Sequence, residues 1–232
     1  MTFNQLAVVD KFSRKDFFDA YKEKYGDKSE YAIDYALRKA ISEGIIYHLG
    51  RNQYAYGKQK HTYAHSYSEE ATRVANEINE KYPEVDFRVF ELMQLNRFVN
   101  HQFAHNTIFI SVENDVVDYI FDSLRNEYPG RIMLKPKVDE YYRYLVDDQI
   151  VVLRLPSETP KGVGEFWKSR LEKILVDITV DKLMSKIVSE SEYHLIFSEA
   201  FNRYFLDLSA MYRYANRKGA GRKFKKLLDE YT

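Results

Sequence analysis

The amino-terminal part of the chain has the hydrophobic spacing of two amphipathic helices. The first is predicted over residues 14–24, with Ser13 as its N-cap. The second is predicted over residues 30–43, with Ser29 as its N-cap and Gly44 at its end. Apolar side chains recur at helical spacing in the second helix, so that one face should pack against a core. Those side chains are Ile33, Leu37, Ala40 and Ile41.

A hairpin is predicted directly after these helices. Two β-prone runs, residues 45–49 and 53–56, flank a glycine-containing turn at residues 50–52. Helix, short turn, helix and hairpin in this order are typical of a winged helix-turn-helix, which most often reads duplex DNA. The residues that we expect to contact DNA are Ser29, Tyr31, Tyr35, Arg38, Lys39, Arg51 and Asn52.

The face of the second helix opposite its apolar side suits nucleic acid. Arg38 and Lys39 can reach guanine acceptors or phosphates, and the two tyrosines can contact phosphates or thymine methyl groups. Arg51, at the tip of the predicted wing, can reach the minor groove or the backbone. Asp34 would repel phosphate unless it pairs with Arg38, four residues on. The alternative is a solvated face that contacts protein.

The remainder of the chain predicts a different architecture. Residues 1–58 form the expected winged helix-turn-helix domain, residues 59–67 a polar linker, and residues 68–232 a second domain. In the second domain predicted strands alternate with helices, which favours a mixed α/β layer with a small sheet and a helical carboxyl-terminal part from residue 165. The predicted strands are residues 85–90, 107–112, 131–134 and 149–155. The predicted helices before residue 165 are residues 68–82, residues 92–99, and a helix that starts at Asn114 or Asp115 and ends at Tyr128. The fold class expected is therefore α+β or α/β.

Composition narrows the function classes. The chain has 232 residues, of which 45% are hydrophobic and 30% charged, and its formal net charge is +0. A nucleic-acid surface must then be local and balanced by acidic segments elsewhere. Because the chain has no cysteine, disulfides, thiolate zinc sites and a catalytic thiol are excluded. No run approaches the ~18 apolar residues of a membrane span. The first residues lack the basic and then apolar pattern of a secretory signal, so we expect a cytoplasmic protein.

Several loosely spaced motifs resemble one known family. They are residues 112–117 continuing to Lys135-Pro136, Asp139 to Tyr144, Leu171 to Ile178, Tyr212 to Arg217, and the wing turn Gly50 to Ala55. Together these motifs resemble AbiEi-type antitoxins of bacterial type IV toxin–antitoxin systems, which act in abortive infection and phage defence. The resemblance implies that the winged helix binds inverted repeats in the promoter of its own operon and represses transcription. It also implies that the second domain counters a nucleotidyltransferase toxin. Two copies on inverted repeats would gain affinity through effective concentration, so a dimer on DNA is expected.

Basic residues concentrate near the carboxyl terminus. This cluster could clamp the DNA backbone, dock an acidic toxin surface, or form a solvated helix. Gly219 and Gly221 within it indicate a helix break rather than a phosphate-binding loop. The cluster consists of Arg213, Arg217, Lys218, Arg222, Lys223, Lys225 and Lys226.

Candidate catalytic groups are weaker. Glu172, Asp177 and Asp181 could hold a metal for nuclease chemistry, but on a helix a structural role is favoured. A nucleotidyltransferase would need a Gly-Ser dipeptide that is absent here. We therefore expect no enzyme activity, metal or cofactor; the alternatives are a metal-dependent nuclease delivered by a winged helix, and a protein-interaction adaptor. Three pairs could suggest a catalytic or metal site. Asp147 with Asp148 is better explained as a turn, and His61 with His65 as linker histidines. Arg97 with His101 matches a ribonuclease-type pair only loosely.

Overall fold

A computed structural model describes residues 2–6, 11–43, 45–56, 61–100, 102–162 and 164–230. The chain separates into two compact units. The smaller unit is Met1–Tyr63 together with Phe201–Ser209, and the larger unit is Ala64–Ala200 together with Ala210–Thr232. The boundaries expected from the sequence do not include this return of a distant segment to the amino-terminal part.

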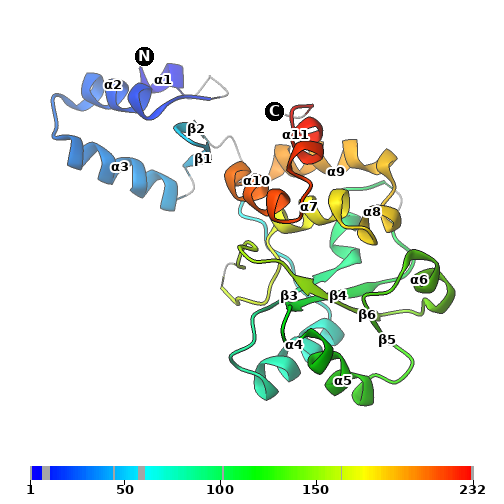
Figure 1. Ribbon diagram of the computed structural model, residues 1–232. Helices are drawn as coiled ribbons and strands as arrows, with labels where there is room; N and C mark the ends of the chain where they lie inside the picture. The colour runs from blue at the N-terminus through cyan, green and yellow to red at the C-terminus, as the bar shows by residue number, and fades with distance from the viewer. Residues whose placement is uncertain are drawn as a thin grey trace. The chain divides into compact units, whose positions relative to one another are not determined.

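The smaller unit contains the two predicted helices and the predicted hairpin (Figure 1). Ser13 caps α2 in a reciprocal capping box with Asp16, and Ser29 accepts a hydrogen bond from the backbone N–H of Ala32 at the start of α3. The predicted end of the second helix, Gly44, lies outside the described residues. The elements are α1 (Phe3–Leu6), α2 (Arg14–Tyr25), α3 (Glu30–Ser42), and the antiparallel strands β1 (Ile46–Gly50) and β2 (Gln53–Tyr56).

One apolar core holds the smaller unit together. Ile33 and Leu37 of α3 are buried as predicted, while Ala40 and Ile41 are partly buried at its margin. The segment before α2 also joins the hairpin, because Phe12 and Tyr54 exchange two backbone hydrogen bonds of 2.8 Å. The buried members of this core are Leu6, Phe12, Phe17, Phe18, Ala20, Ile33, Leu37 and Ile46.

The larger unit is built on a four-stranded mixed sheet in the order β3-β4-β6-β5 (Figure 1). β3 is antiparallel to β4, whereas β4, β6 and β5 run parallel to one another. The carboxyl ends of the three parallel strands therefore meet at one edge. All four predicted strands are confirmed, with bounds β3 (Phe87–Glu91), β4 (Thr107–Glu113), β5 (Ile132–Leu134) and β6 (Gln149–Leu155).

Helices cover both faces of this sheet. α4 (Glu69–Lys81) and α5 (Val117–Glu127) pack on one face in the main core, and α7 (Leu171–Val180) lies on the other (Figure 1). A short 3₁₀ helix, η1 (Leu92–Arg97), follows β3. Helix α6 (Val138–Tyr144) lies in a stretch where the sequence analysis predicts no helix. The fold is thus mixed α and β, as expected.

The carboxyl-terminal part is helical, as predicted. The chain turns between α10 and α11 at Gly219, whose φ of 71° confirms the expected break. No helix in the described part of the chain has both the length and the apolar character needed to cross a membrane. Beyond α7 the helices are α8 (Met184–Ile187), α9 (Glu190–Arg203), α10 (Leu208–Arg217) and α11 (Gly221–Leu228).

Candidate nucleic-acid interface

The side of α3 away from the core carries large exposed side chains. Tyr31 is 84% exposed and Tyr35 is 63% exposed, and both rings therefore stand in solvent. Arg38 and Lys39 continue this face toward the carboxyl end of the helix and are exposed as well. Lys39 approaches Glu43 at 3.8 Å, a distance at which an exposed pair contributes little. The helix thus offers two aromatic rings and two cations to a partner.

Asp34 on the same helix has a partner other than the one expected. It pairs with Arg14 of α2, whose Nη2 lies 2.9 Å from Asp34 Oδ1. The partner that neutralises Asp34 is thus Arg14 rather than Arg38, because α2 packs against α3 and brings the guanidinium of Arg14 to the carboxylate. Arg14 also stacks over the ring of Phe18 at 4.2 Å. The negative charge of Asp34 is balanced within the smaller unit.

The turn of the hairpin is tied to the start of α2. Asn52 has a left-handed φ of 57°, which asparagine tolerates better than most residues. Its Oδ1 accepts a hydrogen bond of 3.0 Å from the backbone N–H of Arg14. Ser29 likewise uses its hydroxyl as a helix cap. Both were expected to contact DNA, and both have structural roles here. Arg51 beside them is exposed at the turn.

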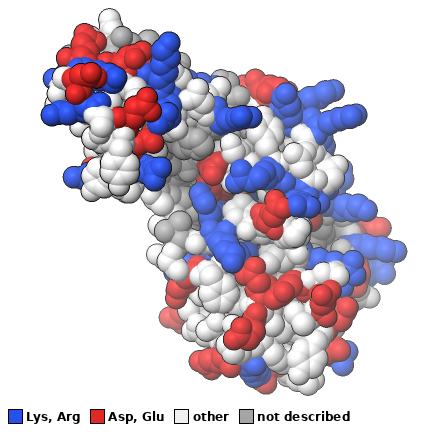
Figure 2. Space-filling model, turned by 60° about the vertical axis from the view of Figure 1, so that its left-hand side comes forward, with Lys and Arg blue, Asp and Glu red and all other residues white. Residues whose placement is uncertain are grey.

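Three of the seven residues of the carboxyl-terminal basic cluster contact other residues of the larger unit, while Lys225 and Lys226 are exposed. Arg217 forms an ion pair with Glu158, and Lys223 donates a hydrogen bond to the carbonyl of Thr179 at 3.1 Å. Lys218 lies between two aspartates and is only 14% exposed. Arg213 and Arg222 are exposed. In Figure 2 basic side chains gather over the helical part of the larger unit, whereas acidic ones gather toward α4 and α5.

Lys218 belongs to a buried cluster of charges that the sequence analysis did not find. Lys173 of α7 lies 2.7 Å from Asp177 Oδ2 and 3.2 Å from the hydroxyl of Ser111. Asp177 Oδ1 accepts from Lys218 Nζ at 2.7 Å and from the Tyr214 hydroxyl at 3.0 Å. The cluster links α7, the sheet and α10. The helical spacing of Lys173 and Asp177 is visible in the sequence, but the other partners are distant.

Burial and the neighbouring charges shift the pKa values of the groups in this cluster. Burial lowers the pKa of Lys173 below its ordinary value, despite the nearby carboxylate. Burial alone would raise the pKa of Asp177, but the ammonium groups of Lys173 and Lys218 lower it overall. Burial, together with the Asp177 carboxylate, raises the pKa of Tyr214 well above its ordinary value. Asp177 is thus held as a carboxylate by cations.

The three acidic residues considered for a metal site each have a basic partner. The oxygens of Asp177 already contact lysines, and Glu172 pairs with Arg170 at 2.7 Å, as the structural interpretation expected. Asp181 contacts Lys218 at 3.1 Å. Among the residues that the structure describes, no group of three or more His, Asp or Glu side chains is arranged to hold a metal ion.

The remaining candidate pairs lie around a buried glutamate. Glu91 accepts hydrogen bonds from Asn106 Nδ2 at 3.1 Å and from the backbone N–H of Ser68 at 3.0 Å, and His65 lies 3.4 Å from it. Burial alone would raise the pKa of Glu91, but these hydrogen bonds lower it overall. Asn106 also contacts the turn that contains the paired aspartates.

Arg97 joins this cluster, whereas His61 belongs to the smaller unit. Arg97 donates to the carbonyl of Ala64 at 2.9 Å, and its Nη2 lies 3.4 Å from His65 Nδ1. Its expected partner His101 lies outside the described residues. The backbone of His61 forms an isolated bridge with Tyr204 in the smaller unit. The structure thus connects one member of each candidate pair, namely His65, Arg97 and, through Asn106, Asp148, around Glu91.

Comparisons with known proteins add one family. Residues 32–232 match the family described as "Family of unknown function (DUF6577)". A search of curated proteins found no match. Among solved structures the chain is similar to "Crystal structure of RV2827C protein from Mycobacterium tuberculosis", with 11% sequence identity and a TM-score of 0.25, covering 97% of this chain and 78% of that chain. A structural similarity this low carries no argument about fold or function.

Proposed function

We propose that this chain, which belongs to the DUF6577 family of unknown function, is a DNA-binding autorepressor and the antitoxin of a type IV toxin–antitoxin pair. The smaller unit would be a winged helix-turn-helix, with α3 as the recognition helix and β1–β2 as the wing. The pairing of Phe12 with Tyr54 beside the hairpin supports this, because it adds a third extended segment to the wing. The proposed place of action is the cytoplasm.

The exposed face of α3 is the observation that carries the proposal. Tyr31 at 84% exposure and Tyr35 at 63% leave a large aromatic area in water, where it contributes nothing to folding. A tyrosine offers a ring for thymine methyl groups and a hydroxyl for phosphates, so it can contact both the base edges in a groove and the backbone beside it. Arg38 follows at the same helical spacing and supplies a fork of donors that matches guanine.

Electrostatics on this face permit the approach of DNA. The carboxylate of Asp34 is balanced by Arg14 at 2.9 Å, and Glu43 lies 3.8 Å from Lys39. The chain as a whole has a formal net charge of +0, so long-range attraction to DNA is weak. Two copies bound to inverted repeats would compensate, since linkage on one duplex raises effective concentration.

A gel-shift assay with the DNA upstream of the gene tests repression. Replacing Arg38 and Lys39 together with alanine should abolish binding and leave the fold intact, because both side chains are exposed. A matched control removes two exposed lysines of the larger unit, Lys161 and Lys186, and should bind as the unchanged protein does. Equal affinity of the Arg38/Lys39 variant and the control would contradict the assignment and favour a protein-interaction adaptor.

The antitoxin role depends on the resemblance to AbiEi-type antitoxins. Co-expression of the full chain with a nucleotidyltransferase encoded beside it should restore growth that the enzyme alone arrests. The Arg38→Ala, Lys39→Ala variant should restore growth equally well, because the proposed neutralising part is the larger unit. Persistent growth arrest with the unchanged chain would contradict the antitoxin role but would leave the DNA-binding proposal unaffected.

A further inference from the structure

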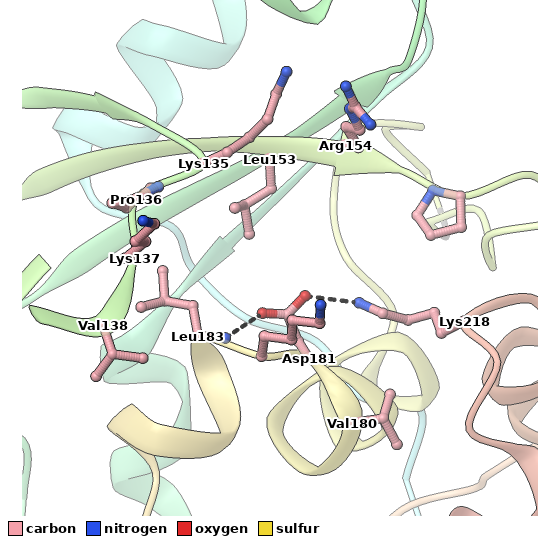
Figure 3. A pocket seen from close by; sticks show the side chains of 12 residues that line it. Lys135, Pro136, Lys137, Val138, Leu153, Arg154, Val180, Asp181, Leu183 and Lys218 are labelled. Atoms are coloured by element: carbon pink, nitrogen blue, oxygen red, sulfur yellow. Dashed lines mark hydrogen bonds and ion pairs between the residues drawn. The ribbon is translucent and has the colours of Figure 1, made fainter. Parts of the chain in front are cut away.

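A cavity in the larger unit lies at the edge where the parallel strands end (Figure 3). Its volume is about 740 Å³, within the range of small-molecule sites. One wall comes from the residues that follow β5 and from the end of β6, and the other from residues 180–183 at the end of α7. In open sheets with parallel strands, ligands bind outside the carboxyl ends of the strands. The position is that of a ligand site.

The inner part of the cavity is aliphatic. Leu153 of β6 and Leu183 reach toward the same space from opposite walls in Figure 3. Val138 of α6 and Val180 of α7 extend these walls. An apolar slot of this kind suits a flat ring, because burying the ring against aliphatic groups removes apolar surface from water.

One ion pair stands beside this slot. Asp181 Oδ2 lies 3.1 Å from Lys218 Nζ, and Asp181 Oδ1 accepts backbone hydrogen bonds from Leu183 at 3.0 Å and Met184 at 3.2 Å. The carboxylate is therefore satisfied and balanced by an adjacent ammonium group. It presents little repulsion to an anion that enters the cavity.

The other charged side chains of the lining are all basic. They are Lys135, Lys137, Arg154 and Lys182. Lys135 forms an ion pair with Asp118 at 2.9 Å. Lys137, Arg154 and Lys182 are exposed and form no ion pair with another residue in the described ranges. Figure 3 shows Arg154 and Lys135 on the side of the strands away from Leu153 and the Asp181–Lys218 pair, so that the cations left at the margin of the slot are Lys137 and Lys182.

We infer that this cavity binds a nucleotide, with its base in the aliphatic slot and its phosphates at the basic margin. A nucleotide combines a flat ring with several negative charges, which is the combination that the two parts of the cavity match. Inorganic phosphate has no group for the slot, and a DNA duplex is too large for a cavity of about 740 Å³. This inference does not depend on the proposed DNA binding.

Isothermal titration calorimetry on the full chain tests the inference, with no DNA in the cell. The probes are ATP, GTP, CTP and UTP, each compared with its nucleoside and with inorganic triphosphate. At least one nucleotide should bind about tenfold more tightly than its nucleoside and than inorganic triphosphate, since only the nucleotide engages both parts. Replacing Lys137 and Lys182 with alanine should weaken that binding by about tenfold or more.

A matched control replaces Arg222 and Lys225, two exposed cations of α11 outside the cavity lining, and should leave the affinity unchanged. Absence of binding by all four nucleotides would overturn the inference. So would equally tight binding of inorganic triphosphate, which would indicate a plain anion site. An affinity unchanged in the Lys137→Ala, Lys182→Ala variant would place the nucleotide elsewhere and overturn it as well.

Discussion

The buried charge cluster of the larger unit predicts an unequal effect of its two central residues. Asp177→Asn removes the carboxylate that lies 2.7 Å from Lys173 Nζ, and leaves the lysine with the Ser111 hydroxyl at 3.2 Å. The side chain of Lys173 is only 1% exposed, so water cannot replace the lost charge. Lys173→Met leaves Asp177 with Lys218 at 2.7 Å and with Tyr214 at 3.0 Å. Asp177→Asn should therefore lower the free energy of unfolding more than Lys173→Met does.

The magnitude follows from the protonation of the stranded lysine. Its ordinary pKa is 10.5, and each pKa unit corresponds to about 1.4 kcal/mol, so keeping it neutral at pH 7 costs about 5 kcal/mol. That sets a ceiling, because a stranded lysine loses its proton rather than remain charged in the interior. We expect Asp177→Asn to lower the free energy of unfolding by about 3–5 kcal/mol. Lys173→Met should cost about 1–3 kcal/mol.

The loss in Asp177→Asn should also depend on pH. In the folded variant Lys173 is neutral, whereas in the unfolded chain it stays protonated up to its ordinary pKa of 10.5. The unfolded state then binds more protons, so stability rises with pH, by about 1.4 kcal/mol per unit between pH 7 and pH 9. The difference in free energy of unfolding between Asp177→Asn and the unchanged protein should therefore become smaller from pH 7 to pH 9.

Urea unfolding followed by tryptophan fluorescence measures both effects. Trp167, the single tryptophan, is buried in the core of the larger unit and reports on that unit. The linear dependence on urea gives the free energy at each pH. A smaller loss for Asp177→Asn than for Lys173→Met would refute the reasoning. A loss that stays constant between pH 7 and pH 9 would refute the proposed neutral lysine.

Three further predictions concern other sites. Asp34→Asn frees Arg14 and should tighten DNA binding several-fold while steepening its salt dependence by about one unit, as titrations at several salt concentrations will reveal. Hydrogen bonds keep the pKa of Glu91 below its ordinary value of 4.5 in the folded state, so the free energy of unfolding should fall as the pH drops below that value. In acid unfolding, Glu91→Gln should make the free energy of unfolding less dependent on pH. Ser29→Ala removes the cap of α3 and should cost about 1 kcal/mol in thermal or urea unfolding of the smaller unit.

Local signals allowed much of the fold to be predicted. Ser13 and Ser29 cap the helices predicted for them, and Ser68 caps the helix predicted from residue 68, because capping depends only on the next three residues. The strands were equally clear from their apolar runs. Helix α6 was missed since its only buried residue is Tyr141, whose hydroxyl bonds to Thr107 far away in the sequence.

The candidate site depended more on tertiary packing. The exposed face of α3 follows directly from the burial of Ile33 and Leu37, so its composition could be predicted. The partner of Asp34 could not, because helical spacing favours Arg38 while helix packing supplies Arg14. The basic run near the carboxyl terminus was interpreted as one surface, yet Lys218 turns inward to aspartates on another helix.

The central claim is that α3 binds duplex DNA, and the salt dependence of binding tests it most directly. The affinity of the full chain for the DNA upstream of its gene is measured over a range of salt concentrations, for the unchanged protein and for Arg38→Ala with Lys39→Ala. Each lost phosphate contact should reduce the slope of log K against log salt by about 0.9, so the variant should lose up to about two units as well as affinity. An unchanged slope and affinity would contradict the claim.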